Sequence, residues 1–374
     1  MTKARTNASA SPAVGRNIIQ NGAMNVAQRS ASVTGIGASA GYFTCDRWKL
    51  NFAGSTAGRL TMSQTSDGPN GISANCIKLD CTTADTSIAA GEFAILQQLI
   101  EGQNLQRLGK GVAGAKQITV SFYVKANAAL TFCLEMRDSD NTRQISKLFT
   151  TTTDWVRHSF LIPADEDDGS SPFADDNGHS FKMTFWLHAG ATYAGGTLNT
   201  AAFANSTNAN RAAGIDSFYS STDNNFFITG VQMEVGPVAT EFEQEDISTT
   251  LQKCYRYFQR LEWGNGSMDV ALQESVSKGI WNVSYTTKRA DPSVTLPTPT
   301  VSDNQANGIS LLTSAGGYRS ASGTEAVAAL SISKDNMRVR LSGFANSGAI
   351  GDATWAYYSS NASIDPYIDL DSEL

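Results

Sequence analysis

Charged side chains are scarce in this chain. Asp, Glu, Lys and Arg make up 17% of its 374 residues, against roughly 25% in average globular proteins, so the surface is expected to be polar mainly through Ser, Thr and Asn. The net charge of −7 disfavours nucleic acid as the main partner, because phosphate binding requires Lys and Arg clustered on one face. At this length we expect about two domains, each with its own core.

Histidine and cysteine are few and follow no catalytic or metal-binding pattern. The five cysteines form no C-x-x-C pair, which gives no signal for zinc or redox chemistry and predicts free, mostly buried thiols. The three histidines are His158, His179 and His188, and neither a nucleophile elbow nor an H-E-x-x-H motif accompanies them. A hydrolytic triad is therefore unsupported, and glycine-rich phosphate loops are absent as well.

Long apolar runs are also missing. No segment of the sequence approaches the ~18 continuous apolar residues of a membrane span, and the first residues lack the apolar core of a signal peptide. We therefore expect synthesis in a cytoplasm, without membrane insertion.

Alternation of apolar and polar residues dominates what is present, and it predicts strands with one buried face. Residues 118–124 and 132–136 alternate in this way and are expected to form a hairpin-like pair. Residues 93–100 have apolar side chains at three- and four-residue spacing, which predicts a short helix or a bulged strand. Residues 195–225 show little periodicity and predict a long loop. Further alternating segments lie at 156–162, 181–187, 227–235, 280–285, 294–296, 327–332 and 337–341.

These many short strands predict an all-β chain built of β-sandwiches. A boundary is expected after Gly236-Pro237 and the acidic residues that follow, where Ser248 could cap a short helix. We divide the chain into an N-terminal arm at 1–30, a first sandwich at 31–245 and a smaller C-terminal β-sandwich at 246–374.

Several short phrases follow one another along the chain. They include Asn21-Gly22-Ala23-Met24, Asp46-Arg47-Trp48, Leu99-Ile100-Glu101-Gly102, Gln232-Met233-Glu234-Val235-Gly236-Pro237 and Cys254-Tyr255-Arg256-Tyr257-Phe258. Together they resemble bacteriophage tail-fibre and tail-tip proteins with a carbohydrate-binding-module-like jelly roll, and the resemblance covers roughly residues 17 to 374. It implies a jelly roll followed by a second β domain, in a virion protein that is commonly a homotrimer facing the host surface. Unlike many fibres, the chain lacks a long collagen-like or coiled-coil shaft, which leaves open a compact knob attached to tail or capsid.

Two charged segments are candidate sites. Lys3, Arg5 and Arg16 lie in a stretch without acidic residues; they are either a virion-docking arm or a solvated tail. Asp165, Glu166, Asp167 and Asp168 follow a predicted strand. A solvated acidic loop is the favoured interpretation, a calcium site is second and a glycosidase carboxylate pair is third.

Aromatic residues near strand ends are candidates for glycan binding, because sugar rings stack on exposed aromatic faces. Trp186, His188 and Tyr193 surround one strand end, and Trp186 is out of phase with its apolar neighbours, so its ring is expected to point away from the core. Tyr219 in the long loop is a fourth candidate. Packing against neighbouring subunits is the alternative for these rings and for Trp355, Tyr357 and Tyr358, whereas Trp48 and Trp155 are expected in the core.

The sequence therefore predicts a non-enzymatic phage attachment protein that binds host surface polysaccharide. Two alternatives remain: a purely structural capsid decoration or tail-knob protein, and a glycan-degrading tailspike.

Overall fold

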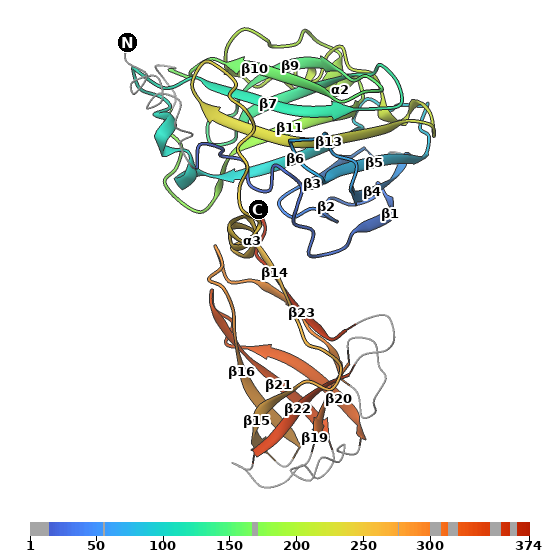
Figure 1. Ribbon diagram of the computed structural model, residues 1–374, viewed down its shortest axis with the longest axis vertical. Coiled ribbons are helices and arrows are strands. Elements are labelled where there is room, and N and C mark those ends of the chain that lie inside the picture. The colour runs from blue at the N-terminus through green and yellow to red at the C-terminus, as the bar shows by residue number, and fades with distance from the viewer. Residues whose placement is uncertain are drawn as a thin grey trace. The chain divides into compact units, whose positions relative to one another are not determined.

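The structure is a computed structural model that describes residues 15–54, 57–166, 171–275, 277–299, 308–312, 321–344, 353–359 and 365–374. The chain forms two compact units, Met1–Leu251 with Leu374, and Gln252–Glu373. Both consist mainly of strands (Figure 1), which confirms the predicted all-β class. No helix in the described ranges is long and apolar enough to span a membrane.

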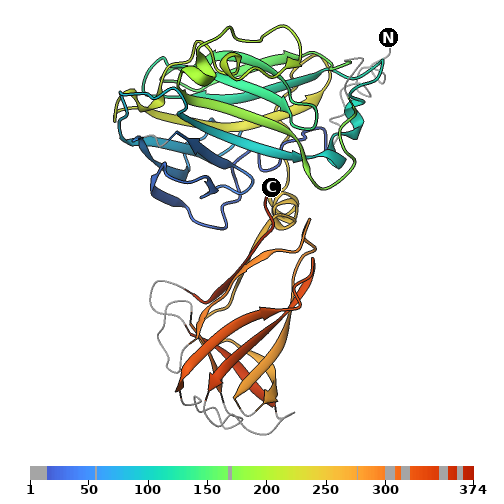
Figure 2. The same cartoon turned by 180° about the vertical axis from the view of Figure 1, so that it is seen from behind.

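The first unit is a sandwich of two antiparallel sheets, which Figures 1 and 2 show from opposite sides. The six-stranded sheet has the order β1 (Ser32–Ile36), β4 (Arg59–Thr65), β5 (Cys76–Thr83), β13 (Asn225–Val235), β7 (Ile118–Lys125), β10 (Val156–Ile162). The seven-stranded sheet has the order β12 (Ala204–Asn205), β9 (Arg143–Thr150), β8 (Thr131–Asp138), β11 (His179–Ala189), β6 (Phe93–Glu101), β3 (Lys49–Ala53), β2 (Gly41–Tyr42). Short helices lie in the connections between strands: η1 (Gly102–Asn104), η2 (Gln106–Leu108), α2 (Ala191–Ala194), η3 (Asn208–Asn210) and η4 (Phe218–Ser220).

The inward residues of the alternating strands meet in one core. Phe122 of β7 lies 5.0 Å, centre to centre, from the ring of Phe185 of β11, so the two sheets pack face to face. Trp48 is fully buried in this core, as predicted. Trp155 is not: its ring is half-buried, and its Nε1 donates to the main-chain oxygen of Asp67.

The sheet order decides between two open alternatives and corrects one local prediction. Residues 93–101 form the strand β6, whose side chains are buried on both faces between β11 and β3. Of the two structures expected for this segment, the strand is therefore the one observed, and the burial on both faces explains the almost unbroken apolar run. The predicted hairpin of residues 118–136 does not form, because β7 and β8 belong to different sheets. The chain crosses the sandwich between them.

Residues 17–26, assigned to the arm by sequence, are part of the sandwich. Ile18, Ile19, Met24 and Val26 are buried, and the main-chain N–H of Val231 in β13 donates to the oxygen of Gly22 at 3.0 Å. The pairing of β13 with β5 ends at Ile228, and the N-terminal segment hydrogen-bonds to β13 beyond this point.

The helix α3 (Ile247–Tyr255) follows the acidic residues, near the predicted boundary at 245. Asp246 rather than Ser248 supplies the cap, since its carboxylate accepts from the main-chain N–H of Ser248 at 2.8 Å. Hydrogen bonds from Ser248 lower the pKa of Asp246.

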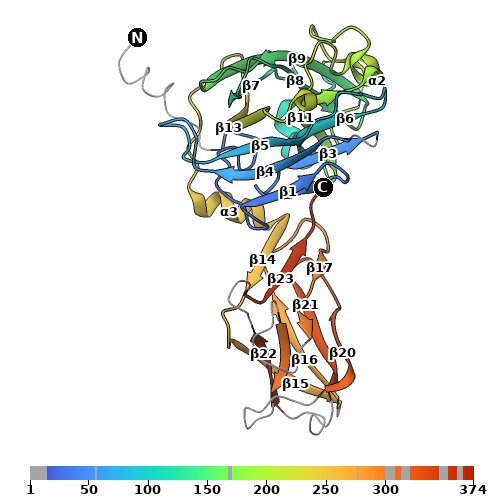
Figure 3. The same ribbon diagram turned by 90° about the vertical axis from the view of Figure 1, so that its right-hand side faces the viewer.

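The second unit is also a β structure. Its three-stranded sheet contains β14 (Phe258–Glu262), β23 (Tyr367–Asp371) and β17 (Ser293–Thr295). Figure 3 shows several strands of its seven-stranded sheet, whose order is β18 (Thr298–Pro299), β19 (Gly308–Leu312), β22 (Ala353–Ser359), β15 (Met268–Ser275), β16 (Lys278–Ser284), β21 (Asn336–Phe344), β20 (Ala321–Leu330). The five cysteines of the whole chain are buried and form no disulfide, as predicted.

Candidate ligand-binding face

The aromatic residues predicted to bind a ligand are mostly buried. Trp186, His188 and Tyr219 have 0% exposed surface, and Tyr193 is half-buried. The expectation of exposed ring faces is therefore corrected for the first three residues.

Trp186 points away from the main core, as its phase on β11 predicted, but the chain that follows β11 covers it. Its ring centre lies 5.6 Å from that of Phe93 and 5.4 Å from that of Tyr193. It packs in a small separate cluster that includes Cys133 and Ala212, and Ala212 N donates to the oxygen of Tyr193. The long loop therefore closes over the ring.

Glu135 on β8 joins this aromatic cluster to Arg211. Its buried carboxylate accepts from Arg211 Nε at 2.7 Å, from Arg211 Nη2 at 2.9 Å and from Trp186 Nε1 at 2.9 Å. The Arg211 guanidinium also lies 4.8 Å from the centre of the Trp186 ring, a cation–π distance. These charge-assisted hydrogen bonds fix the ring and the loop that carries Arg211.

Two further cations stand beside Glu135 on the outward face of the seven-stranded sheet. Lys182 on β11 and Arg137 on β8 are direct cross-strand partners. Burial lowers the pKa of Lys182, and the positive charges of Arg137 and Arg211 lower it further. Within the described part of the chain, no carboxylate lies at ion-pair distance from Lys182 or Arg137. We call Arg137, Lys182 and Arg211 the basic patch.

Uncharged polar side chains continue this face. Gln97 on β6 lies opposite Thr184 on β11, and neither side chain hydrogen-bonds to another described residue. Gln144 on β9 lies opposite Arg137. Its Nε2 is buried without a hydrogen-bond partner among the residues whose placement is described, which is uncommon because buried polar groups are normally paired.

His188 and Tyr219 hold the loop after β11 rather than a ligand. His188 Nδ1 lies 2.8 Å from Ser217 Oγ, and the His188 and Tyr219 rings are 5.3 Å apart. Burial lowers the pKa of His188 and raises that of Tyr219. Both shifts favour the neutral side chains, which suits a packed interior.

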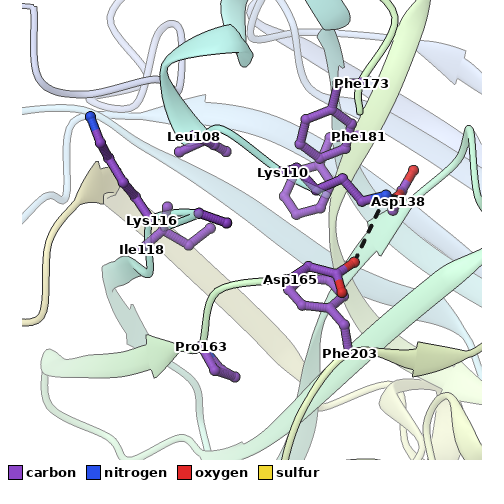
Figure 4. Close-up of a pocket in the computed structure, with 11 residues that line it drawn as sticks. Leu108, Lys110, Lys116, Ile118, Asp138, Pro163, Asp165, Phe173, Phe181 and Phe203 are labelled. Carbon is purple, nitrogen blue, oxygen red and sulfur yellow. Dashed lines mark ion pairs between the residues drawn. The ribbon is translucent and has the colours of Figure 1, made fainter. Parts of the chain in front are cut away.

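The predicted acidic site is occupied by the chain's own cations. Asp165 accepts from Arg143 Nε and Nη2, each at 2.9 Å in its closest contact. Figure 4 shows the Lys110 ammonium between Asp165 and Asp138, with Nζ 4.0 Å and 2.8 Å from their respective carboxylates. Glu166 is exposed. Asp167 and Asp168 lie outside the described residues.

This arrangement corrects the calcium and glycosidase interpretations of Asp165. A carboxylate that already binds two cations has little capacity left for calcium, and no described group of three or more His, Cys, Asp or Glu residues could hold a metal ion. The hollow beside Lys110 has a free volume of about 20 Å³, which is room for about one water molecule. A sugar ring does not fit there.

The docking residue Arg16 is bound to its own sandwich. Its Nε lies 3.6 Å from the Glu234 carboxylate, and its Nη2 donates to the oxygen of Glu241 at 2.7 Å. Arg16 is therefore tied to its own sandwich, Lys3 and Arg5 lie outside the described residues, and docking of these residues on a virion stays a prediction.

The aromatic cluster of the second unit divides between its core and its surface. Tyr358 is buried, stacked on Trp263 at 4.4 Å between ring centres. Trp355 is 37% exposed, opposite Val270, which is 59% exposed. Together with Met268 and Leu272 they make an exposed apolar face on β15 and β22, which we call the apolar face.

No known family profile and no curated protein sequence matches the chain. Among solved structures, the enzymatically active domain of tailspike protein 4 from bacteriophage CBA120 is similar at 11% identity with a TM-score of 0.31, over 59% of this chain and 22% of that chain. A family 11 carbohydrate-binding module from Clostridium thermocellum, in complex with a mixed-linked tetrasaccharide, is 10% identical with a TM-score of 0.26, over 56% and 99%. A putative sugar-binding protein from Bacteroides thetaiotaomicron is 11% identical with a TM-score of 0.30, over 59% and 100%. The function proposed below therefore rests on the geometry and sequence of this chain.

Proposed function

We propose that the chain is a non-enzymatic attachment component of a bacteriophage particle that binds a host surface polysaccharide. The ordered phrases shared with tail-fibre and tail-tip proteins support the assignment to a virion. The outward face of the seven-stranded sheet in the first unit is the proposed binding surface.

The observation that carries this proposal is the set of polar side chains without partners on that face. Gln97 and Thr184 are largely buried, with 4% and 2% of their surfaces exposed. They make no side-chain hydrogen bond to the described residues and are neighbours across two strands. Amide and hydroxyl groups can both donate to and accept from sugar hydroxyls. Because they project from paired strands rather than from a free loop, their spacing is fixed before a ligand arrives, which reduces the entropy lost on binding.

The pairing of the acidic residues supports binding without cleavage. Glycosidases need one carboxyl group to donate a proton and a second to act as base or nucleophile at the sugar. Asp138 and Asp165 are instead both buried beside Lys110. We therefore expect no release of reducing sugars from a polysaccharide that the chain binds.

The test is binding of the labelled, purified chain to a panel of bacterial strains, with and without the soluble surface polysaccharide of each strain. We expect saturable binding to some strains, abolished by their own polysaccharide. The variant Gln97→Leu with Thr184→Val is expected to bind roughly 30-fold more weakly, since two hydrogen bonds of about 1 kcal/mol each are lost. Ser159→Ala, at an exposed position of the six-stranded sheet, is the control and should bind like the unaltered chain. Binding that the double variant retains in full would exclude this face.

A structural role in assembly is the second candidate, and the apolar face of the second unit favours it. Met268, Val270 and Leu272 are each more than half exposed on a strand that lies inside its sheet. Contiguous exposed apolar surface commonly marks a protein contact. The partner we propose is a second copy of this chain, in the homotrimer that the resemblance implies.

Replacing Leu272 by Glu is expected to convert the oligomer into a monomer, because a carboxylate at the contact would lose its hydration without gaining a partner. Multi-angle light scattering across a dilution series measures the mass. Leu161→Glu, at an exposed leucine of the first unit, should leave the oligomer intact. A monomeric unaltered chain at all concentrations would contradict the homotrimer.

A further inference from the structure

The basic patch has an excess of positive charge that the described residues do not neutralise. Arg137, Lys182 and Arg211 face a single carboxylate, Glu135, and that carboxylate is already bound on both oxygens by Arg211 and Trp186. Arg137 has a neutral partner, donating from Nη1 to Ser206 Oγ at 3.1 Å. For Lys182, no partner is found in the part of the chain that the structure describes.

This excess of positive charge destabilises the folded chain when no ligand is bound. Like charges directly opposite each other on one face of a sheet destabilise the pair, and Lys182 and Arg137 are such partners. Both are partly buried, so water screens their repulsion less than at a fully exposed site. A bound anion would remove the repulsion and supply the missing hydrogen-bond acceptors.

We infer that the polysaccharide bound by this face carries anionic groups, either carboxylates or phosphates, which lie against Lys182 and Arg137. This inference rests on the proposed function and names the ligand class of the same surface. Gln144 Nε2, buried beside Arg137 without a partner in the described chain, adds an uncharged donor for the same anion. Gln97 and Thr184 are the next cross-strand pair on this face, and they are expected to hydrogen-bond to the sugar hydroxyls.

Charge and burial together favour a saccharide over a nucleic acid. Single-stranded nucleic acids bind with their bases stacked on exposed aromatic rings and their backbone along an extended basic surface. Here Trp186 is fully buried, the patch contains three cations, and the whole chain carries a net charge of −7. A short row of anions on an otherwise uncharged polymer fits this surface better.

The test measures binding of the full chain to polygalacturonate, to a phosphate-bearing teichoic acid, to neutral dextran and to single-stranded DNA, at two salt concentrations. We expect binding to one of the two acidic saccharides, weakened by salt, and none to DNA. Lys182→Gln and Arg137→Gln should each weaken it roughly 10-fold or more, as expected for a lost charge-assisted hydrogen bond. Lys78→Gln, at a partly exposed lysine of the six-stranded sheet, is the matched control and should bind normally.

Thermal unfolding of the same variants separates a binding role from a structural one. Without ligand, Lys182→Gln should melt at the same temperature as the unaltered chain or higher, because a repulsion is removed. Binding to dextran alone would overturn the anionic ligand and leave the proposed function standing, whereas binding to no saccharide on any tested strain or polymer would overturn both. Binding to single-stranded DNA as strong as binding to the acidic saccharides would also overturn the inference. So would a Lys182→Gln variant that melts at a lower temperature than the unaltered chain and binds the saccharide normally.

Discussion

Glu135→Gln is expected to lower the free energy of unfolding by about 3–5 kcal/mol, the range found when one partner of a buried ion pair is removed. The carboxylate is fully buried and accepts hydrogen bonds from Arg211 and Trp186. An amide of nearly the same shape keeps the packing but turns one acceptor into a donor and removes the negative charge that Glu135 places among the three cations of the basic patch. Urea denaturation followed by tryptophan fluorescence measures the change.

Glu274→Gln is the matched control for this experiment. Glu274 lies 3.5 Å from Arg340 on the surface of the second unit, with about a third of its side chain exposed, so its loss is expected to cost at most about 1 kcal/mol. If Glu135→Gln loses stability because the cations of the basic patch then repel one another, combining it with Lys182→Gln should recover part of the lost stability. Equal effects of Glu135→Gln and Glu274→Gln would contradict the role assigned to the buried carboxylate.

Gly22→Ala is expected to have the second largest effect, lowering stability by about 3 kcal/mol, at the upper end of the usual cost of overpacking. A Cβ atom at this position would lie 2.2 Å from the main-chain oxygen of Val231. Relief of this overlap requires separation of the N-terminal segment from β13, which would break the hydrogen bond from Val231 N to the Gly22 oxygen. The same urea titration measures the change.

Gly91→Ala tests whether the effect comes from the close approach. A Cβ atom at Gly91 would meet nothing within 4 Å, so this variant should be as stable as the unaltered chain. A Gly22→Ala variant of normal stability would show that residues 17–26 are not docked against β13.

Much of the secondary structure could be predicted because alternation is a local property. β10, β11 and β13 lie where the apolar phase indicated. The sheet to which a strand belongs is not local, and that is why β7 and β8 were paired wrongly. In β6, burial on both faces removes the alternation of apolar and polar residues, so its apolar residues also fit the three- and four-residue spacing of a helix.

The candidate site was less accessible to sequence reasoning. The outward direction of Trp186 followed from its phase, but its cover comes from a loop that packs back over the sheet. Nothing in the sequence indicates that Asp165 is ion-paired, because its partner Arg143 lies on the strand β9, 22 residues away in the chain. The basic patch did leave a signal, the outward phase of Arg137 and Lys182 on their strands, which the net charge of the whole chain obscured.

The place of β13 in its sheet also determines when the first unit can be completed during synthesis. β13 is the last strand of this unit in the chain, yet it lies between β5 and β7. Until residues 225–235 leave the ribosome, the six-stranded sheet consists of two separate parts, each with an unpaired edge that can aggregate. The unit is therefore expected to fold late and as a whole, and a nascent chain that stops before Asn225 should need protection from a chaperone.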